Sequence, residues 1–158
     1  MHFYNETKSV ESDRLTNRMF VTMDGCTANV NGNLIMTLDD VEFQNPLNLY
    51  LFAMNHTGEV KYFSKNRVYS CKIYDNGTIV RDFVPVISVN NIYGLFDKIN
   101  NKFYSSATDD FIGGNVVKYV DMGNNTKCTR LEYIECVDTS HIDTKFIPNQ
   151  DTRIVMKM

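Results

Sequence analysis

The sequence contains no tryptophan, few histidines and no long apolar run. No stretch approaches the roughly 18 apolar residues that a membrane-spanning helix needs. The first 18 residues lack the basic and apolar regions of a signal peptide. The net charge of −3 comes from mixed signs, without a run of Lys or Arg that could follow a phosphate backbone. These absences predict that neither nucleic acid nor membrane insertion is part of the function.

Motifs for metal binding and nucleophilic catalysis are also missing. The cysteines lack the close pairs of zinc and thiol-exchange sites, which favours free, mostly buried thiols at Cys26, Cys71, Cys128 and Cys136. The histidines are scattered, without ligands at metal-binding spacing: His2, His56 and His141. No G-x-S-x-G elbow and no phosphate cradle occurs, and Gly113-Gly114 is interpreted as a turn that ends a strand.

The acidic residues do not form the pair that a glycoside hydrolase requires. Such enzymes place two carboxylates across a cleft, about 5 to 9.5 Å apart. Glu132 and Glu135 are three positions apart and would face opposite sides of a strand, while neighbouring acids diverge at Asp39-Asp40 and Asp109-Asp110. We therefore predict no catalytic residues and no enzymatic activity.

The residues that are present predict a single β domain. The length of 158 residues suits one domain with its own core. Three turn dipeptides, Asp24-Gly25, Asn31-Gly32 and Asn76-Gly77, are each flanked by short apolar or β-branched runs, as in β-hairpins. Apolar and polar residues alternate along Val68 to Asp75, so one face of that strand should be buried.

About ten strands at regular spacing, with no amphipathic helix between them, predict an all-β fold of two antiparallel sheets. Besides the strands around these turns, we expect strands at 47–54, 92–97, 102–106, 130–136, 141–146 and 152–158. The polar, turn-rich segment 118–129 is predicted to be a linker or long loop.

Two features of the side chains bear on function. Arg81-Asp82 is a charged pair inside an apolar strand, and because neighbours on a strand face opposite sides, each should find its own partner. We expect a structural role for this pair. The chain also has 9 Tyr and 10 Phe, and exposed tyrosine rings suit the C–H face of a sugar, although the lack of tryptophan weakens that interpretation.

Two segments carry a family resemblance, YSCKIYDNGTIVRDFVP from Tyr69 to Pro85 and GLFDKINNKFYSS from Gly94 to Ser106, followed by FIGG. They resemble the C-terminal half of laminin-G-like jelly-roll domains of the concanavalin A-like lectin/glucanase superfamily. Similar sequences occur in phage tail, prophage and gut bacterial surface proteins. The resemblance implies a two-sheet jelly-roll sandwich used for adhesion or glycan recognition.

The segment Arg130 to Met158 resembles the opening strands of the same family, although it follows the closing strands here. We therefore expect the main part of the sandwich in 1–117 and a completing unit in 130–158. A circularly permuted domain, a fragment of two tandem domains and a strand donated to a neighbouring subunit remain alternatives. Of these, we favour completion within the chain, because the termini of a sandwich often lie close together.

The leading functional hypothesis is a non-catalytic, carbohydrate-binding or adhesion module of a phage tail or bacterial surface protein. It would act on a virion or cell surface, with a glycan or surface receptor as partner. A glycoside hydrolase or lyase and a structural module with a swapped C-terminal strand are the alternatives. The sequence assigns no ligand-binding residue and no cofactor, and calcium is the one cation considered, at the loop residues Asp109, Asp110 and Asp121.

Overall fold

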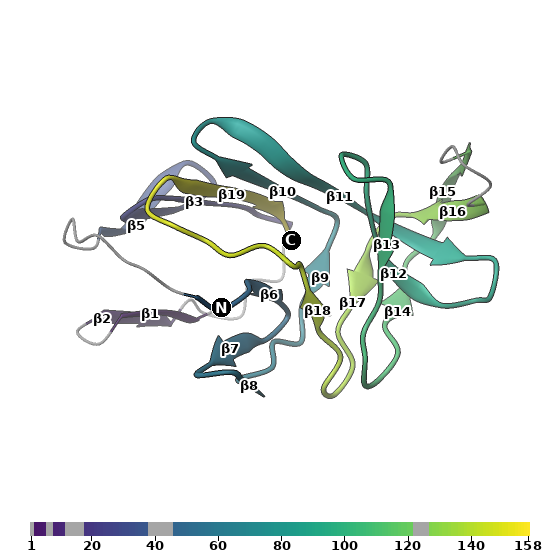
Figure 1. Cartoon of the computed structure of the whole chain (residues 1–158), viewed down its shortest axis with the longest axis horizontal. Coiled ribbons are helices and arrows are strands. Elements are labelled where there is room, and N and C mark those ends of the chain that lie inside the picture. The colour runs from purple at the N-terminus through teal and green to yellow at the C-terminus, as the bar shows by residue number, and fades with distance from the viewer. Residues whose placement is uncertain (1, 6–7, 12–17, 38–45, 122–126) are drawn as a thin grey trace.

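The computed structural model describes the chain except residues 1, 6–7, 12–17, 38–45 and 122–126 (Figure 1). Every strand pairing in the described part is antiparallel, which confirms the all-β, antiparallel class. None of the described residues forms a helix that could cross a membrane.

One large sheet dominates the molecule, and its main path runs in the order β13-β12-β11-β10-β19-β3-β4-β5. A branch, β16 followed by β15, pairs with the end of β11. The strands of this sheet are β3 (Phe20–Asp24), β4 (Thr27–Val30), β5 (Asn33–Thr37), β10 (Ser70–Asp75), β11 (Thr78–Ser88), β12 (Tyr93–Asp97), β13 (Lys102–Tyr104), β15 (Val116–Asp121), β16 (Lys127–Leu131) and β19 (Thr152–Lys157).

Two of the three predicted hairpin turns are confirmed. Asn31-Gly32 joins β4 to β5 with φ angles of 51° and 81°, and Asn76-Gly77 joins β10 to β11 with 46° and 75°. Positive φ at both central residues matches the twist of the flanking strands. The first turn was misplaced by one residue, because Asp24 closes β3 and Gly25, with φ of 50°, is the first turn residue.

The C-terminal strand β19 lies inside the large sheet. It pairs with β10 over 70–75 and with β3 over 20–24, so it joins the two halves of the sheet within one chain (Figure 1). Its side chains alternate between buried and more exposed positions, as expected for a strand with one covered face.

The segment 118–129, predicted to be a linker or long loop, is strand at both of its ends, and residues 122–126 lie outside the described residues. β15 and β16 form an antiparallel hairpin in this region, with Lys118 opposite Arg130 and Asp121 opposite Lys127. The polar composition that suggested a linker is compatible with a strand at the margin of a sheet, where only one neighbour supplies backbone hydrogen bonds.

Four small sheets accompany the large sheet in the described part of the chain. Their strands are β14 (Ile112–Gly113), β17 (Ile134–Glu135) and β9 (Arg67–Val68) in one sheet, β18 (Ile142–Asp143) and β6 (Tyr50–Leu51) in a second, β7 (Met54–His56) and β8 (Glu59–Lys61) in a third, and β1 (His2–Asn5) and β2 (Lys8–Glu11) in a fourth.

Three strands predicted in the region of the small sheets are shorter than expected. The expected strand 47–54 is interrupted at Phe52, whose φ of 70° is rare for a bulky residue. The expected strand 130–136 breaks between Leu131 and Ile134, and only two residues of 141–146 pair.

The core lies between the large sheet and the small sheets. Cys71, Ile73 and Phe83 of the large sheet belong to the same buried cluster as Ile134 and Ile142 of the small sheets. The alternation predicted along Val68 to Asp75 is confirmed, because Lys72 is exposed between two fully buried neighbours. The larger buried cluster therefore lies between two layers. A second, smaller cluster lies within the large sheet and consists of Val84, Val86, Phe96 and Cys128.

Candidate binding surface

The short pair β6–β18 presents a polar and aromatic face to solvent. Leu51 lies opposite Ile142 and Tyr50 lies opposite Asp143. Leu51 and Ile142 are buried in the core, with 4% and 0% of their surface exposed. Because successive side chains point to opposite faces, Tyr50 and Asp143 share the outer face of this pair.

The rings of Tyr50 and Phe63 lie beside the imidazole of His141, which is itself buried, with 9% of the residue exposed. The ring centroid of Tyr50 lies 5.4 Å from that of His141, and the centroid of Phe63 lies 6.1 Å from the same imidazole. His141 directly precedes β18 and lies behind these two rings, where it supports them. Its Nδ1 atom lies 3.0 Å from the carbonyl oxygen of Thr139, a contact that restricts the orientation of the ring.

Hydrogen-bonding groups border the rings. The Asn48 side-chain amide donates to Asp143 Oδ2 at 3.2 Å, and Lys145 Nζ contacts the same oxygen at 2.5 Å. Burial by itself raises the pKa of Asp143, but hydrogen bonds from Lys145 and Asn48 outweigh burial and lower it below its usual range. The hydrogen bond to Asp143 raises the pKa of Lys145 in turn. This pair therefore stays charged at neutral pH.

We call this set of side chains the β6–β18 surface: Asn48, Tyr50, Phe63, His141, Asp143 and Lys145. It combines flat apolar faces with amide, carboxylate and ammonium groups that retain hydrogen-bonding capacity. Within it, the Lys145 side chain is 61% exposed, while the Asp143 side chain is 21% exposed. The ammonium group is therefore the more accessible end of this ion pair.

The β7–β8 hairpin is attached to the same region. The side-chain amide of Asn55 donates to the carbonyl oxygen of Asn48 at 3.1 Å. The hairpin carries His56, whose ring lies 6.1 Å from that of Tyr62 in an edge-on arrangement. Tyr62 is 67% exposed and has a φ of 54°, in the left-handed region that tyrosine rarely adopts. The local backbone thus holds a second aromatic side chain in solvent next to Phe63.

Sequence reasoning missed this surface. It treated the histidines as scattered, yet His141 contacts the aromatic side chains of this surface, and His56 contacts Tyr62 on the adjoining segment. The side chain of His2 lies outside the described residues. The signal was the alternation of polar and apolar residues over 48–51 and 141–144. No local pattern showed that these two segments pair.

A second exposed group combines arginines with tyrosines. The Arg18 guanidinium carbon lies 4.4 Å above the Tyr69 ring, and the Arg67 carbon lies 4.4 Å above the Tyr133 ring. The two tyrosine rings contact each other, with centroids 5.5 Å apart. We call these four residues the arginine–tyrosine cluster. The guanidinium groups stack on the electron-rich faces of the tyrosine rings, and their N–H groups stay free to bond carboxylates.

The placement predicted for Glu132 and Glu135 on opposite sides of one strand is wrong. The chain leaves β16 at Leu131 and enters β17 at Ile134, so strand alternation does not relate the two residues. Glu132 pairs with Arg18, and Glu135 pairs with Arg67 at 2.7 Å. Both carboxylates therefore contact the arginine–tyrosine cluster.

Close packing explains the glycine pair better than a turn does. Neither Gly113 nor Gly114 has a positive φ angle. A Cβ atom on Gly113 would lie 2.4 Å from the Tyr93 ring, and one on Gly114 would lie 2.6 Å from the Tyr133 ring. Glycine at these positions lets two tyrosine rings lie directly against the backbone.

The acidic residues considered for calcium or catalysis do not gather. Asp109 accepts hydrogen bonds from the backbone N–H and hydroxyl of Thr139, which lower the pKa of the carboxyl group. Among the described residues, no three His, Cys, Asp or Glu side chains are arranged to hold a metal ion. The side chain of Asp121 and the whole of Asp39-Asp40 lie outside the described residues.

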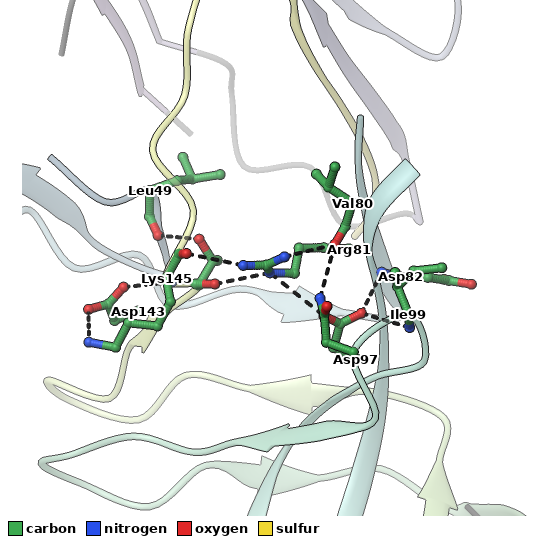
Figure 2. Close-up of polar contacts among 10 residues, drawn as sticks. Leu49, Val80, Arg81, Asp82, Asp97, Ile99, Asp143 and Lys145 are labelled. Carbon is green, nitrogen blue, oxygen red and sulfur yellow. Dashed lines mark hydrogen bonds and ion pairs between the residues drawn. The ribbon is translucent and has the colours of Figure 1, made fainter. Parts of the chain in front are cut away.

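Arg81 and Asp82 do find separate partners, as predicted for neighbours on a strand. Arg81 Nε lies 3.6 Å from Asp97 Oδ2, and Asp82 Oδ2 lies 2.6 Å from Lys98 Nζ. Figure 2 shows the guanidinium directed away from Asp82 and toward the segment that contains Asp143 and Lys145. Arg81 therefore connects the large sheet to the segment that carries part of the β6–β18 surface.

Three of the cysteines are free thiols in the core, as predicted: Cys71, Cys128 and Cys136. Burial raises the pKa of Cys71 to about 12, with a smaller contribution from the charge of Asp82. Burial also raises the pKa of Cys128 and of Cys136. These side chains are protonated at neutral pH and act as small apolar residues.

Comparisons found no protein-family model, no curated protein and no solved structure that significantly matches this chain. The resemblance to concanavalin A-like domains therefore stays a prediction.

Proposed function

We propose that the protein is a lectin-like, jelly-roll module that binds a glycan through the β6–β18 surface. In this proposal it serves as a non-catalytic adhesion domain of a phage tail or bacterial surface assembly. The observation that carries the proposal is the combination of the more exposed rings of Tyr50 and Phe63, supported by the buried imidazole of His141, with the polar side chains of Asn48, Asp143 and Lys145.

The chemistry of a sugar ring explains why this face suits it. A pyranose presents a C–H patch that packs on an aromatic ring and hydroxyl groups that need donors and acceptors at its edge. Tyr50 supplies a partly exposed ring, and Asp143 supplies a charged acceptor beside it. Lys145 adds donors at the margin of the surface. Bonds to charged groups are stronger than bonds between neutral groups.

Rigid support favours binding. Leu51 and Ile142 anchor the surface in the core, and residues fixed before binding lose little further entropy when a ligand arrives. Lys145 and Asn48 both hold Asp143, so its carboxylate is oriented in the free protein. A preorganised site of this kind can bind a short oligosaccharide without rearrangement of the backbone.

Replacement of the central ring should abolish most of the affinity. We expect Tyr50→Ala to weaken binding by at least about tenfold to the oligosaccharide that gives the strongest signal on a glycan array. Tyr50→Phe keeps the ring and should retain affinity within about threefold, because the hydroxyl adds only one hydrogen bond. Isothermal titration calorimetry measures both effects, and thermal unfolding confirms that each variant is folded.

Tyr74→Ala is the matched control, since Tyr74 is a half-buried tyrosine on β10 whose ring lies under Arg153 instead of on the β6–β18 surface. Its removal should leave glycan affinity unchanged. The proposal fails if the wild-type protein binds no glycan on the array, or if the Tyr50→Ala and Tyr74→Ala variants bind equally well.

A glycoside hydrolase is the second candidate, and the position of Glu132 and Glu135 at the arginine–tyrosine cluster favours it. Both carboxylates are already paired with arginines, so we expect the protein to release no more reducing ends from mixed polysaccharides than a Glu132→Gln/Glu135→Gln variant does. Release by the wild type alone would replace the binding proposal with a catalytic one.

A further inference from the structure

Arg81 makes an unusual set of contacts for a residue on a strand. Its side chain is only 16% exposed and lies near Asp97. Its guanidinium donates to three backbone carbonyl oxygens, those of Val80 at 2.8 Å, Thr144 at 3.2 Å and Lys145 at 3.1 Å (Figure 2). One side chain of β11 therefore holds two consecutive carbonyls of the segment after β18.

Asp97 fixes the other end of this arrangement. Its carboxylate is fully buried at the end of β12. It accepts hydrogen bonds from the N–H groups of Asp82 at 3.0 Å and Ile99 at 3.1 Å, and from the Asn100 side chain at 2.6 Å. These hydrogen bonds fix the orientation of the Asp97 carboxylate. The carboxylate in turn restricts the position of the Arg81 guanidinium.

The segment that Arg81 holds is the one that orients the charged pair of the β6–β18 surface. Thr144 is fixed from its other side, because its N–H and hydroxyl both donate to the carbonyl oxygen of Leu49. Lys145 has a φ of 53°, a left-handed conformation that orients its N–H toward Asp143 Oδ1 at 2.9 Å. The hydrogen bond from Arg81 to the Lys145 carbonyl oxygen stabilises this backbone conformation.

We infer that Arg81 is a positioning residue for glycan binding: anchored by Asp97, it sets the Asp143–Lys145 pair beside Tyr50. This inference rests on the proposed function. An arginine is required because its planar fork presents several N–H groups in fixed directions to separate acceptors. The ammonium group of a lysine is a point charge and cannot hold both carbonyls in the same way.

The test compares Arg81→Lys with a control, Arg153→Lys, at a half-exposed arginine on β19 that pairs with Asp24. Against the array oligosaccharide that wild type binds most tightly, we expect Arg81→Lys to lose at least about fivefold in affinity. Arg153→Lys should bind as wild type does. Asp97→Asn, which keeps an acceptor for the two backbone N–H groups, serves as the second variant if Arg81→Lys fails to fold.

A double-mutant cycle separates positioning from a merely structural role. If Arg81 acts through the charged pair, the affinity losses of Arg81→Lys and Lys145→Met should be strongly non-additive. Wild-type affinity in folded Arg81→Lys, or full additivity with Lys145→Met, overturns the inference while leaving the proposed function intact.

Failure of the proposed function gives a different result. If wild type binds no glycan, amide NMR shifts still test the positioning role: Arg81→Lys should move the signals of residues 143–145 and leave those of β3 and β4 in place. Unchanged signals at 143–145 contradict the inference independently of any ligand.

Discussion

A chain that ends at Asp151 should fail to fold. Loss of residues 152–158 removes β19, which pairs with β10 on one side and β3 on the other. The buried side chains of Ile154, Met156 and Met158 leave the core with it. At about 1.5–3 kcal/mol each, three such side chains contribute an amount comparable to the whole stability of a typical domain, about 5–15 kcal/mol. Loss of near-UV circular dichroism and of dispersed NMR signals measures the effect.

Two controls make this prediction specific to β19. Arg153→Ala changes an exposed residue of the strand and should leave the protein folded. A synthetic peptide of residues 150–158 should restore native signals to the truncated chain, because the vacant position between β10 and β3 can accept an added strand. A truncated chain with wild-type spectra would show that β19 is dispensable.

Light scattering on the same variants tests strand exchange. If β19 is donated to a neighbouring subunit, the wild-type protein should be an oligomer. Pairing within the chain predicts a wild-type monomer. The two arrangements therefore differ in the mass of the wild-type protein, while truncation removes the strand between β10 and β3 in both.

The sequence predicted those parts of the fold that depend on adjacent residues, such as tight turns. Asn31-Gly32 and Asn76-Gly77 were found from two residues each, because few residue types accept a positive φ at both positions. Phe52 shows the limit, since its left-handed backbone contradicts the preference of phenylalanine for strands while its side chain is buried in the core. The hairpin β15–β16 was missed for a related reason, because its polar residues match a loop composition.

The candidate surface was not predictable because its parts are distant in sequence. Tyr50 and Asp143 become neighbours only through the pairing of β6 with β18, two strands of two residues each. The Arg81-Asp82 pair was noticed as two charges in an apolar strand, and the need for separate partners followed from strand geometry. Asp97, the partner of Arg81, was not identified, because nothing in its neighbourhood marks it as buried.

Removal of the Asp97 carboxylate should cause the largest loss of stability from a single substitution. Asp97→Ala would leave the backbone N–H groups of Asp82 and Ile99 without this acceptor, and the guanidinium of Arg81 would lose its charge partner. Breaking a buried pair on one side costs about 3–5 kcal/mol, since a charge stays buried without compensation. Urea unfolding should show a lower midpoint with an unchanged slope.

A comparison with the exposed carboxylate of Asp24 tests whether burial causes the loss of stability in Asp97→Ala. Asp24→Ala removes a partner of Arg153 from an exposed pair with a 3.8 Å separation, and should cost no more than about 1 kcal/mol. Asp97→Asn should fall between the two, because its side-chain oxygen can still accept from the backbone N–H groups while the charge is lost. Equal destabilisation by Asp24→Ala and Asp97→Ala would mean that Asp97 contributes no more than a surface charge. The anchor of Arg81 would then be absent, and with it the physical basis for its hold on the Thr144 and Lys145 carbonyls.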